Sequence, residues 1–159
     1  MSKKFTIVIP TFNNIKYLKL CIESIIKNSS TSHQLVVHVN GLDQDTEFFL
    51  DKQKILYTKT NTNVGLCTGV NLAANKAKTN YILYAHDDMY FLPNWDIHLV
   101  EEVDRINHNN FYLSMTHISY MDAVKGDLQH IQFDCGSNLQ EFDEKKLLEM
   151  EENSKDQIQ

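Results

Sequence analysis

Short apolar runs alternate with helical patterns of apolar residues along the first half of the chain. Runs rich in β-branched and aromatic residues predict a buried strand at 5–9 and further strands at 34–39, 54–60 and 81–85. Between these runs, apolar residues at helical spacing predict helices at 15–26, 45–52 and 66–78. We expect Pro10 to end the first strand and Asn13 or Asn14 to cap the helix that follows it. Further along, the pattern predicts a helix at 95–107 and a strand at 111–120.

Strands that alternate with helices predict an α/β fold, with a mostly parallel sheet and helices on both of its faces. The carboxyl ends of parallel strands lie at one edge of the sheet, where ligands bind. Three polar segments follow predicted strands and should meet at that edge, namely 10–14, 40–45 and 86–88. We expect one domain over residues 1–139 and an acidic segment, helical or partly disordered, over residues 140–159.

The composition is that of a folded protein, with 42% apolar and 23% charged residues. The net charge of −6 leaves no broad basic surface, so we do not expect nucleic-acid binding. Cys21, Cys67 and Cys135 are widely spaced and fit neither a zinc motif nor a disulfide framework. The apolar run at 5–9 is too short for a membrane span or a signal peptide. We therefore expect a cytoplasmic protein and leave open its attachment to the periphery of a membrane.

Two adjacent acids, Asp87 and Asp88, follow the strand predicted at 81–85. Neighbouring carboxylates repel each other unless a cation or hydrogen-bond donors offset their charge. Magnesium ions usually bind one or two carboxylates and complete their shell with substrate phosphates. The pair therefore suggests a divalent metal that bridges a diphosphate. Capping of the following turn by the two acids explains the pair equally well.

Four segments of the chain, in order, resemble segments of the family 2 glycosyltransferases. Residues 5–13, a strand followed by Pro-Thr-Phe-Asn, resemble the opening of that family, whose loop holds the nucleotide base. Residues 61–74 resemble its Asn-x-Gly segment and the small-residue helix below the donor. Residues 81–95 resemble its Asp-x-Asp region with a downstream Trp. Residues 142–152 have the spacing of its Phe-Asp-Glu…Glu-Asp stretch, which carries the catalytic base.

The resemblance implies a GT-A-type, Rossmann-like fold and the inverting transfer of a sugar to a saccharide or other hydroxyl acceptor from a nucleotide-diphosphate donor. It implies a set of donor-binding residues: Pro10, Thr11, Phe12, Asn13, Asn40, Asn63, Gly65 and Asp87. Asp88 would be the main ligand of Mn²⁺ or Mg²⁺, with His86 beside it. Glu152, or its neighbour Glu151, would deprotonate the acceptor hydroxyl.

The chain departs from the family pattern at three places. Val39 stands where the family has an Asp that pairs with the base, so Asp43 or Asp45 would have to reach the base, unless both are turn residues. His86 replaces the first Asp of Asp-x-Asp, which either favours Mn²⁺ or marks a locally hydrogen-bonded residue.

The third departure concerns the catalytic base. Glu152 replaces an Asp and is one methylene longer, and residues 149–152 also fit the solvated face of a helix. Family domains continue well beyond this point, whereas the chain ends seven residues later. The oligomeric state is left open. The second hypothesis is therefore a catalytically incomplete nucleotide-sugar-binding module of the same fold.

Overall fold

The computed structural model describes residues 4–121 and 130–155. Contacts divide the chain into two compact units, Met1–Val103 and Asp104–Gln159, which are described separately below. This division differs from the boundary expected between residues 139 and 140, which stays a prediction. No helix among the described residues is long and apolar enough to cross a membrane.

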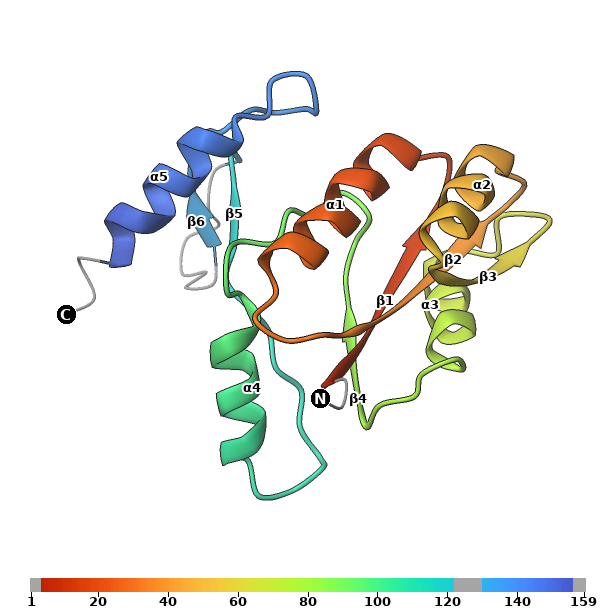
Figure 1. Cartoon of the computed structure of the whole chain (residues 1–159), viewed down its shortest axis with the longest axis horizontal. Coiled ribbons are helices and arrows are strands. Elements are labelled where there is room, and N and C mark those ends of the chain that lie inside the picture. Colours follow the sequence, from red (N-terminus) through yellow and green to blue (C-terminus); the bar gives the residue numbers. More distant parts are fainter. Residues whose placement is uncertain (1–3, 122–129, 156–159) are drawn as a thin grey trace. The chain divides into compact units, whose positions relative to one another are not determined.

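The first unit is built on a four-stranded sheet in the order β3-β2-β1-β4, and every neighbouring pair is parallel (Figure 1). Its strands are β1 (Phe5–Thr11), β2 (Gln34–Asn40), β3 (Leu56–Thr60) and β4 (Tyr81–Tyr84). Its helices are α1 (Ile15–Asn28), α2 (Gln44–Gln53), α3 (Leu66–Ala74) and most of α4 (Asp96–Arg105). The alternation of strands and helices expected from the sequence is confirmed.

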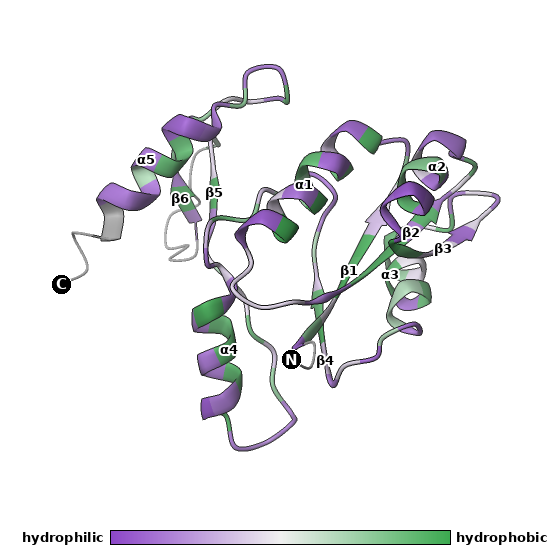
Figure 2. Ribbon diagram, in the orientation of Figure 1, coloured by the Kyte–Doolittle hydropathy of each residue, from purple (hydrophilic) through white to green (hydrophobic). Residues whose placement is uncertain are grey.

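Alternate residues of β1 supply two separate cores, because successive side chains of a strand point to opposite faces. Ile7 and Ile9 pack in a cluster with buried residues of α1 and α2. Val8 packs on the other face with Ala73 of α3. Helices therefore cover both faces of the sheet. β1 is buried along its whole length, and Figure 2 shows its middle coloured as hydrophobic.

Pro10 does not end the first strand, as the sequence had suggested, but lies inside β1 opposite His38 of β2. The carbonyl of Val8 accepts a hydrogen bond from Ala85, on the side of β4. Pro10 faces the same side two residues later, where β4 has already ended at Tyr84. Because no neighbouring strand needs a donor there, the missing N–H of proline costs no ladder hydrogen bond.

Other element ends also differ from the pattern. The helix predicted to reach residue 78 ends at Ala74, since Lys76 and Ala77 donate to carbonyls only three residues back. The strand predicted at 54–60 begins at Leu56, because Lys54 ends α2 in the left-handed conformation, with φ of 57°.

The second unit contains β5 (His117–Ser119), β6 (His130–Gln132) and α5 (Glu144–Lys155). The two short strands pair in parallel, with His117 opposite His130. The strand predicted at 111–120 is thus reduced to three residues. Most of the acidic segment 140–159 forms α5, on which Leu147 is buried, and residues 156–159 lie outside the described part of the chain.

A buried carboxylate ties α4 to the connection between α1 and β2. Asp96 is fully buried and accepts hydrogen bonds from the backbone N–H groups of Ser30 and Thr31, at 2.8 and 3.0 Å. The Nε2 atom of His33 lies 2.9 Å from the same carboxylate. Burial opposes the charge of Asp96, but these hydrogen bonds outweigh it and lower its pKa to about 2.

We expect stability to fall in acid because of Asp96. Its folded pKa lies below its ordinary value of 3.8, so its contribution is complete above about pH 4 and is lost as the pH falls toward 2. That contribution is roughly 2 kcal/mol. Urea unfolding between pH 2 and 7 should show Asp96→Asn less stable by about this amount at neutral pH, with a gap that narrows below pH 4. A gap independent of pH would contradict this.

Close packing of α3 on β2 predicts that Gly69→Ala is destabilising. A Cβ atom at Gly69 would lie 2.8 Å from the ring of His38, which is fully buried. Overpacking costs about 1–3 kcal/mol, which offsets or exceeds the ~1 kcal/mol that alanine adds in helix propensity. Denaturant unfolding should place Gly69→Ala roughly 0.5–2.5 kcal/mol below Asn71→Ala, an exposed change in the same helix. Equal stabilities would argue against the contact.

Candidate functional site

The carboxyl ends of β1, β2 and β4 lie at one edge of the parallel sheet. They deliver Thr11, Asn40 and the segment 86–88 to that edge, as the sequence predicted. This is the edge at which parallel sheets bind ligands.

Asp87 joins the end of β4 to the end of β1 and the start of α1. Its Oδ2 atom accepts a hydrogen bond from Oγ1 of Thr11 at 2.6 Å, and its Oδ1 atom accepts one from Nδ2 of Asn14 at 3.0 Å. Thr11 is buried and Asp87 is half-buried. Hydrogen bonds to a carboxylate are stronger than those between neutral groups. Asp87 is therefore held in place before any ligand arrives.

The side chain of Asn14 hydrogen-bonds this carboxylate instead of capping its own helix. It occupies the N-cap position of α1, as one of the two predicted candidates, but its side chain makes no capping hydrogen bond. Its amide donates to Asp87 instead. The other candidate, Asn13, adopts the left-handed conformation with φ of 52°. Asn tolerates this conformation better than most residues, and such strain is common at binding sites.

Asp88 and His86 are both exposed. The Nε2 atom of His86 lies 3.0 Å from the hydroxyl of Tyr84, and the two rings are 5.0 Å apart. The local hydrogen bond considered for His86 from the sequence is therefore present. Its Nδ1 atom is the ring nitrogen that Tyr84 does not engage.

The described residues contain no group of three or more His, Cys, Asp or Glu side chains able to hold a metal ion. A single exposed carboxylate nevertheless fits Mg²⁺ or Mn²⁺, since such ions bind through one or two carboxylates when phosphates complete the shell. Asp88 offers that carboxylate. The two oxygens of Asp87 already accept hydrogen bonds from Thr11 and Asn14. The residues thus fit a metal ion that binds together with a diphosphate, and they do not form a complete metal site by themselves.

The acidic loop imposes a negative field on its surroundings. The thiol of Cys21 lies in α1 and donates to the carbonyl of His86 at 3.4 Å. Burial, and then the charges of Asp87 and Asp88, raise its pKa to about 12. Burial and the same two acids also raise the pKa of Tyr84. Cys21 is thus a protonated packing residue and no nucleophile, and a cation at the loop would be stabilised.

A second polar cluster joins β2 to the segment before α3. Nδ2 of Asn40 donates to Oδ1 of Asn63 at 3.0 Å, and Oδ1 of Asn40 accepts from the backbone of Val64 at 2.8 Å. The backbone N–H of Gly65 also donates to Asn63, at 2.9 Å. Both asparagine side chains are therefore used to shape the loop. Gly65 has φ of 81°, a conformation that favours glycine.

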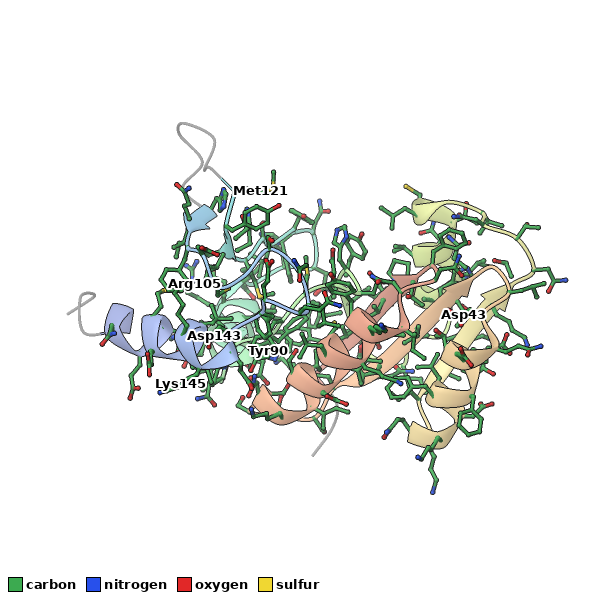
Figure 3. The ribbon with its side chains drawn as sticks, turned by 90° about the horizontal axis from the view of Figure 1, so that it is seen from above. Asp43, Tyr90, Arg105, Met121, Asp143 and Lys145 are labelled. Carbon is green, nitrogen blue, oxygen red and sulfur yellow. The ribbon has the colours of Figure 1, made fainter. Side chains whose placement is uncertain are left out.

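An open pocket of about 520 Å³ lies beside the starts of α1 and α2, and it is lined by Asn13, Ile15, Leu42, Asp43, Gln44 and Asp45. Asp43, labelled in Figure 3, is the N-cap of α2. Among the predicted donor-binding residues, Asn13 lines this pocket. Phe12 precedes Asn13 in the sequence and is half-exposed. A Cβ atom at Gly41 would lie 3.3 Å from the ring of Phe12. Gly41 also has φ of 111°, so glycine suits this position both by its backbone conformation and by its lack of a side chain against Phe12.

The remaining predicted residues lie elsewhere. Pro10 is buried within β1. Glu151 is half-buried and Glu152 is exposed, and both lie on α5 in the second unit. Their roles stay predictions.

Sequence reasoning missed three residues of the site. Asn14 was expected only as a cap, Cys21 only as a cysteine outside any zinc motif or disulfide framework, and Tyr84 only as a strand residue. Only for Tyr84 was there a usable signal, because residues two apart on an extended chain share a side and Tyr84 is two residues from His86.

The chain has relatives among curated proteins. It is 29% identical over 90 residues to the glycosyltransferase GlyA of Streptococcus pneumoniae serotype 4 (strain ATCC BAA-334 / TIGR4), an alignment that covers 54% of this chain and 13% of GlyA. It is 25% identical over 131 residues to an uncharacterized glycosyltransferase of Rickettsia bellii (strain RML369-C), covering 80% of this chain and 19% of that protein. The chain thus matches less than a fifth of the length of either relative.

Among solved structures, the fold is similar to that of TarS from S. aureus. The TarS 1–349 complex with UDP superposes with a TM-score of 0.57 at 21% identity, over 64% of this chain and 32% of that one. A second TarS structure also gives a TM-score of 0.57, at 20% identity, over 70% of this chain and 24% of that one. The sheet is therefore of the GT-A type, as the resemblance implied.

The model of the family described as glycosyl transferase family 2 matches residues 6–157, almost the whole chain. The chain belongs to glycosyl transferase family 2.

Proposed function

We propose that the first unit binds a nucleoside-diphosphate sugar and that the protein transfers the sugar to a hydroxyl acceptor with inversion and metal assistance. The observation that carries this proposal is the hydrogen-bonded junction of Thr11, Asn14 and Asp87 beside the exposed Asp88. It presents one fixed and one available carboxylate at the ligand-binding edge of a GT-A-type sheet. Membership of the family supports the reaction class.

Different residues of the first unit would bind different parts of the sugar donor. Asp87, held by two donors, is placed to accept hydrogen bonds from donor hydroxyls with its remaining lone pairs. Asp88 would hold Mn²⁺ or Mg²⁺, with His86 next to it. Such an ion neutralises negative charge on the departing diphosphate when it is bound. Asn40 and Asn63 hold the loop before α3 in shape through their hydrogen bonds, and we include both among the residues that bind the donor.

The open pocket at the starts of α1 and α2 is the proposed place of the base. The exposed ring of Phe12 offers a face for stacking near this pocket. TarS, which is similar in fold, has been crystallised with UDP, so uracil is the first base to test.

The acceptor side of the reaction is assigned to Glu152, with Glu151 as its neighbour. Inversion needs a single base that removes a proton from the acceptor hydroxyl during in-line attack. Glu152 lies in the third turn of α5, and its side chain is exposed.

A donor-binding module without turnover is the second candidate function. Val39, at the position where the family carries a base-pairing Asp, is buried in the core shared by α1 and α2. No polar group at that position reaches a ligand. The donor site is thus altered at one position even though its framework is retained.

Asp88→Ala should abolish the metal dependence of nucleotide binding. Calorimetric titration of the full chain with UDP, GDP and dTDP, with and without MnCl₂, measures this directly. We expect Mn²⁺ to strengthen binding to the original protein and Asp88→Ala to weaken it about 10-fold or more, since metal sites respond on this scale even to changes around their ligands. Glu23→Ala, an exposed change on α1, is the matched control. Unchanged metal dependence in Asp88→Ala would remove the assignment.

Glu152→Gln should separate catalysis from donor binding. General-base catalysis contributes about 10²–10⁴-fold, so we expect kcat to fall by that order while UDP affinity stays the same. The assay follows UDP release from a UDP-sugar in the presence of a panel of hydroxyl acceptors, with Glu151→Gln alongside. A full loss in Glu151→Gln and none in Glu152→Gln would move the base to Glu151. Absence of turnover in the original protein, with UDP still bound, would favour the binding module.

A further inference from the structure

The acidic loop, residues 86–91, is bound to α1 on both sides of Asp88. Before Asp88, the thiol of Cys21 donates to the carbonyl of His86. After it, the N–H and the carbonyl of Phe91 both form hydrogen bonds with side chains of α1. The side chain of Asp88 lies between these two points and is exposed. The position of its backbone is therefore set by α1.

Two buried side chains of α1 hold Phe91. The N–H of Phe91 donates to Oγ of Ser24 at 3.0 Å, and its carbonyl accepts from Nδ2 of Asn28 at 2.6 Å. The hydroxyl of Ser24 donates to the carbonyl of Cys21 at 2.8 Å, so its oxygen is the acceptor for Phe91. Asn28 also donates to the hydroxyl of Tyr90, labelled in Figure 3, at 3.3 Å. Because the ring of Phe91 is buried as well, this residue anchors the acidic loop to α1.

The residues of α1 that contact this loop share one face of the helix. Asn14, Cys21 and Asn28 are seven residues apart, which is about two helical turns. Ser24 lies one turn from both Cys21 and Asn28. Ser24 and Asn28 are only 2% and 7% exposed, among buried apolar residues of the same helix. Buried polar side chains need hydrogen-bond partners, and the acidic loop supplies one to each.

We infer that Ser24 and Asn28 are positioning residues, which hold Asp88 where it can bind a divalent cation together with the donor diphosphate. A loop that is ordered beforehand loses less conformational freedom on binding. The described residues supply no three-ligand cluster that would hold an ion by itself, so the place of Asp88 depends on its backbone. This inference rests on the proposed function, because it takes Asp88 as the metal ligand. It goes beyond that function in giving a role to two buried residues of α1.

Ser24→Ala tests the inference through the effect of Mn²⁺ on nucleotide binding. Calorimetric titration of the full chain with UDP, GDP and dTDP, in MnCl₂ and in EDTA, gives the metal gain, which is the ratio of the two affinities. Substitution of residues that orient metal ligands lowers metal affinity about 10- to 100-fold. Because Ser24 acts through the backbone of the loop, we expect the lower end of this range, a metal gain reduced about 10-fold. Asn28→Ala should have the same effect.

Two control variants separate positioning from stability. Ser24→Thr keeps the hydroxyl and should keep the metal gain within about threefold. Val36→Ala removes packing in the apolar cluster on the opposite face of the sheet, and should lower stability in urea without changing the metal gain. Hydrogen exchange of the free protein adds a readout without ligand. Exchange over residues 86–91 should be faster in Ser24→Ala, where the N–H of Phe91 has lost its acceptor, and unchanged in Val36→Ala.

Each outcome decides the inference. Loss of the metal gain in both variants that lose a contact to Phe91, with retention in the two controls, supports it. A metal gain that survives Ser24→Ala overturns it while the proposed function stands. An equal loss in Val36→Ala also overturns it, because the loss then follows the stability of the fold. Failure of the folded original protein to bind any nucleotide overturns the proposed function and this inference together.

Discussion

The parallel pairing of β1 with β2 and β4 is the constraint on which the site depends. β1 is buried along its whole length, so its register is fixed by apolar contacts on both faces. A slip by one residue would exchange Ile7 and Ile9 for Val8 on the core of α1 and α2. It would also move Thr11 away from Asp87, 76 residues along the chain. The packing of the sheet therefore places Thr11 within hydrogen-bonding distance of Asp87 at the candidate site.

Helix capping and ligand binding compete for the same side chains at this edge, because helices start where strands end. Asn14 stands at the N-cap of α1 but serves Asp87, so α1 begins without a side-chain cap. Asp43, by contrast, caps α2 and accepts hydrogen bonds from the backbone N–H and the hydroxyl of Thr46. At the start of α1 the polar side chain of Asn14 therefore supports the candidate site, whereas at the start of α2 that of Asp43 stabilises the helix. Which residues remain for a ligand follows from this division rather than from exposure alone.

Sequence patterns predicted the elements better than their ends, and the ends are decided by neighbours that a local pattern cannot show. Pro10 is tolerated inside β1 only because β4 has ended beside it. The edge that carries the candidate site was predictable, because strands that alternate with helices predict a parallel sheet and the polar segments follow its strands. The partners of Asp87 were not, because residues 73 and 76 positions away became adjacent only through the register of the sheet. Similarly, the hydrogen bond between Asn40 and Asn63 joins residues 23 positions apart and could not be predicted from the sequence.

Three aspartates of the first unit show how the surroundings assign different roles to one side chain. Asp96 is fully buried, and Ser30, Thr31 and His33 surround its carboxylate. Its role is therefore structural, because its hydrogen bonds connect α4 to the segment between α1 and β2. Asp87 has one donor on each oxygen and keeps lone pairs for a ligand. Asp88 is exposed, and its charge acts together with burial and Asp87 to raise the pKa of Cys21. The capacity to bind a cation rises along this series as internal donors decrease, because a carboxylate that the fold has not satisfied gains most from an external charge.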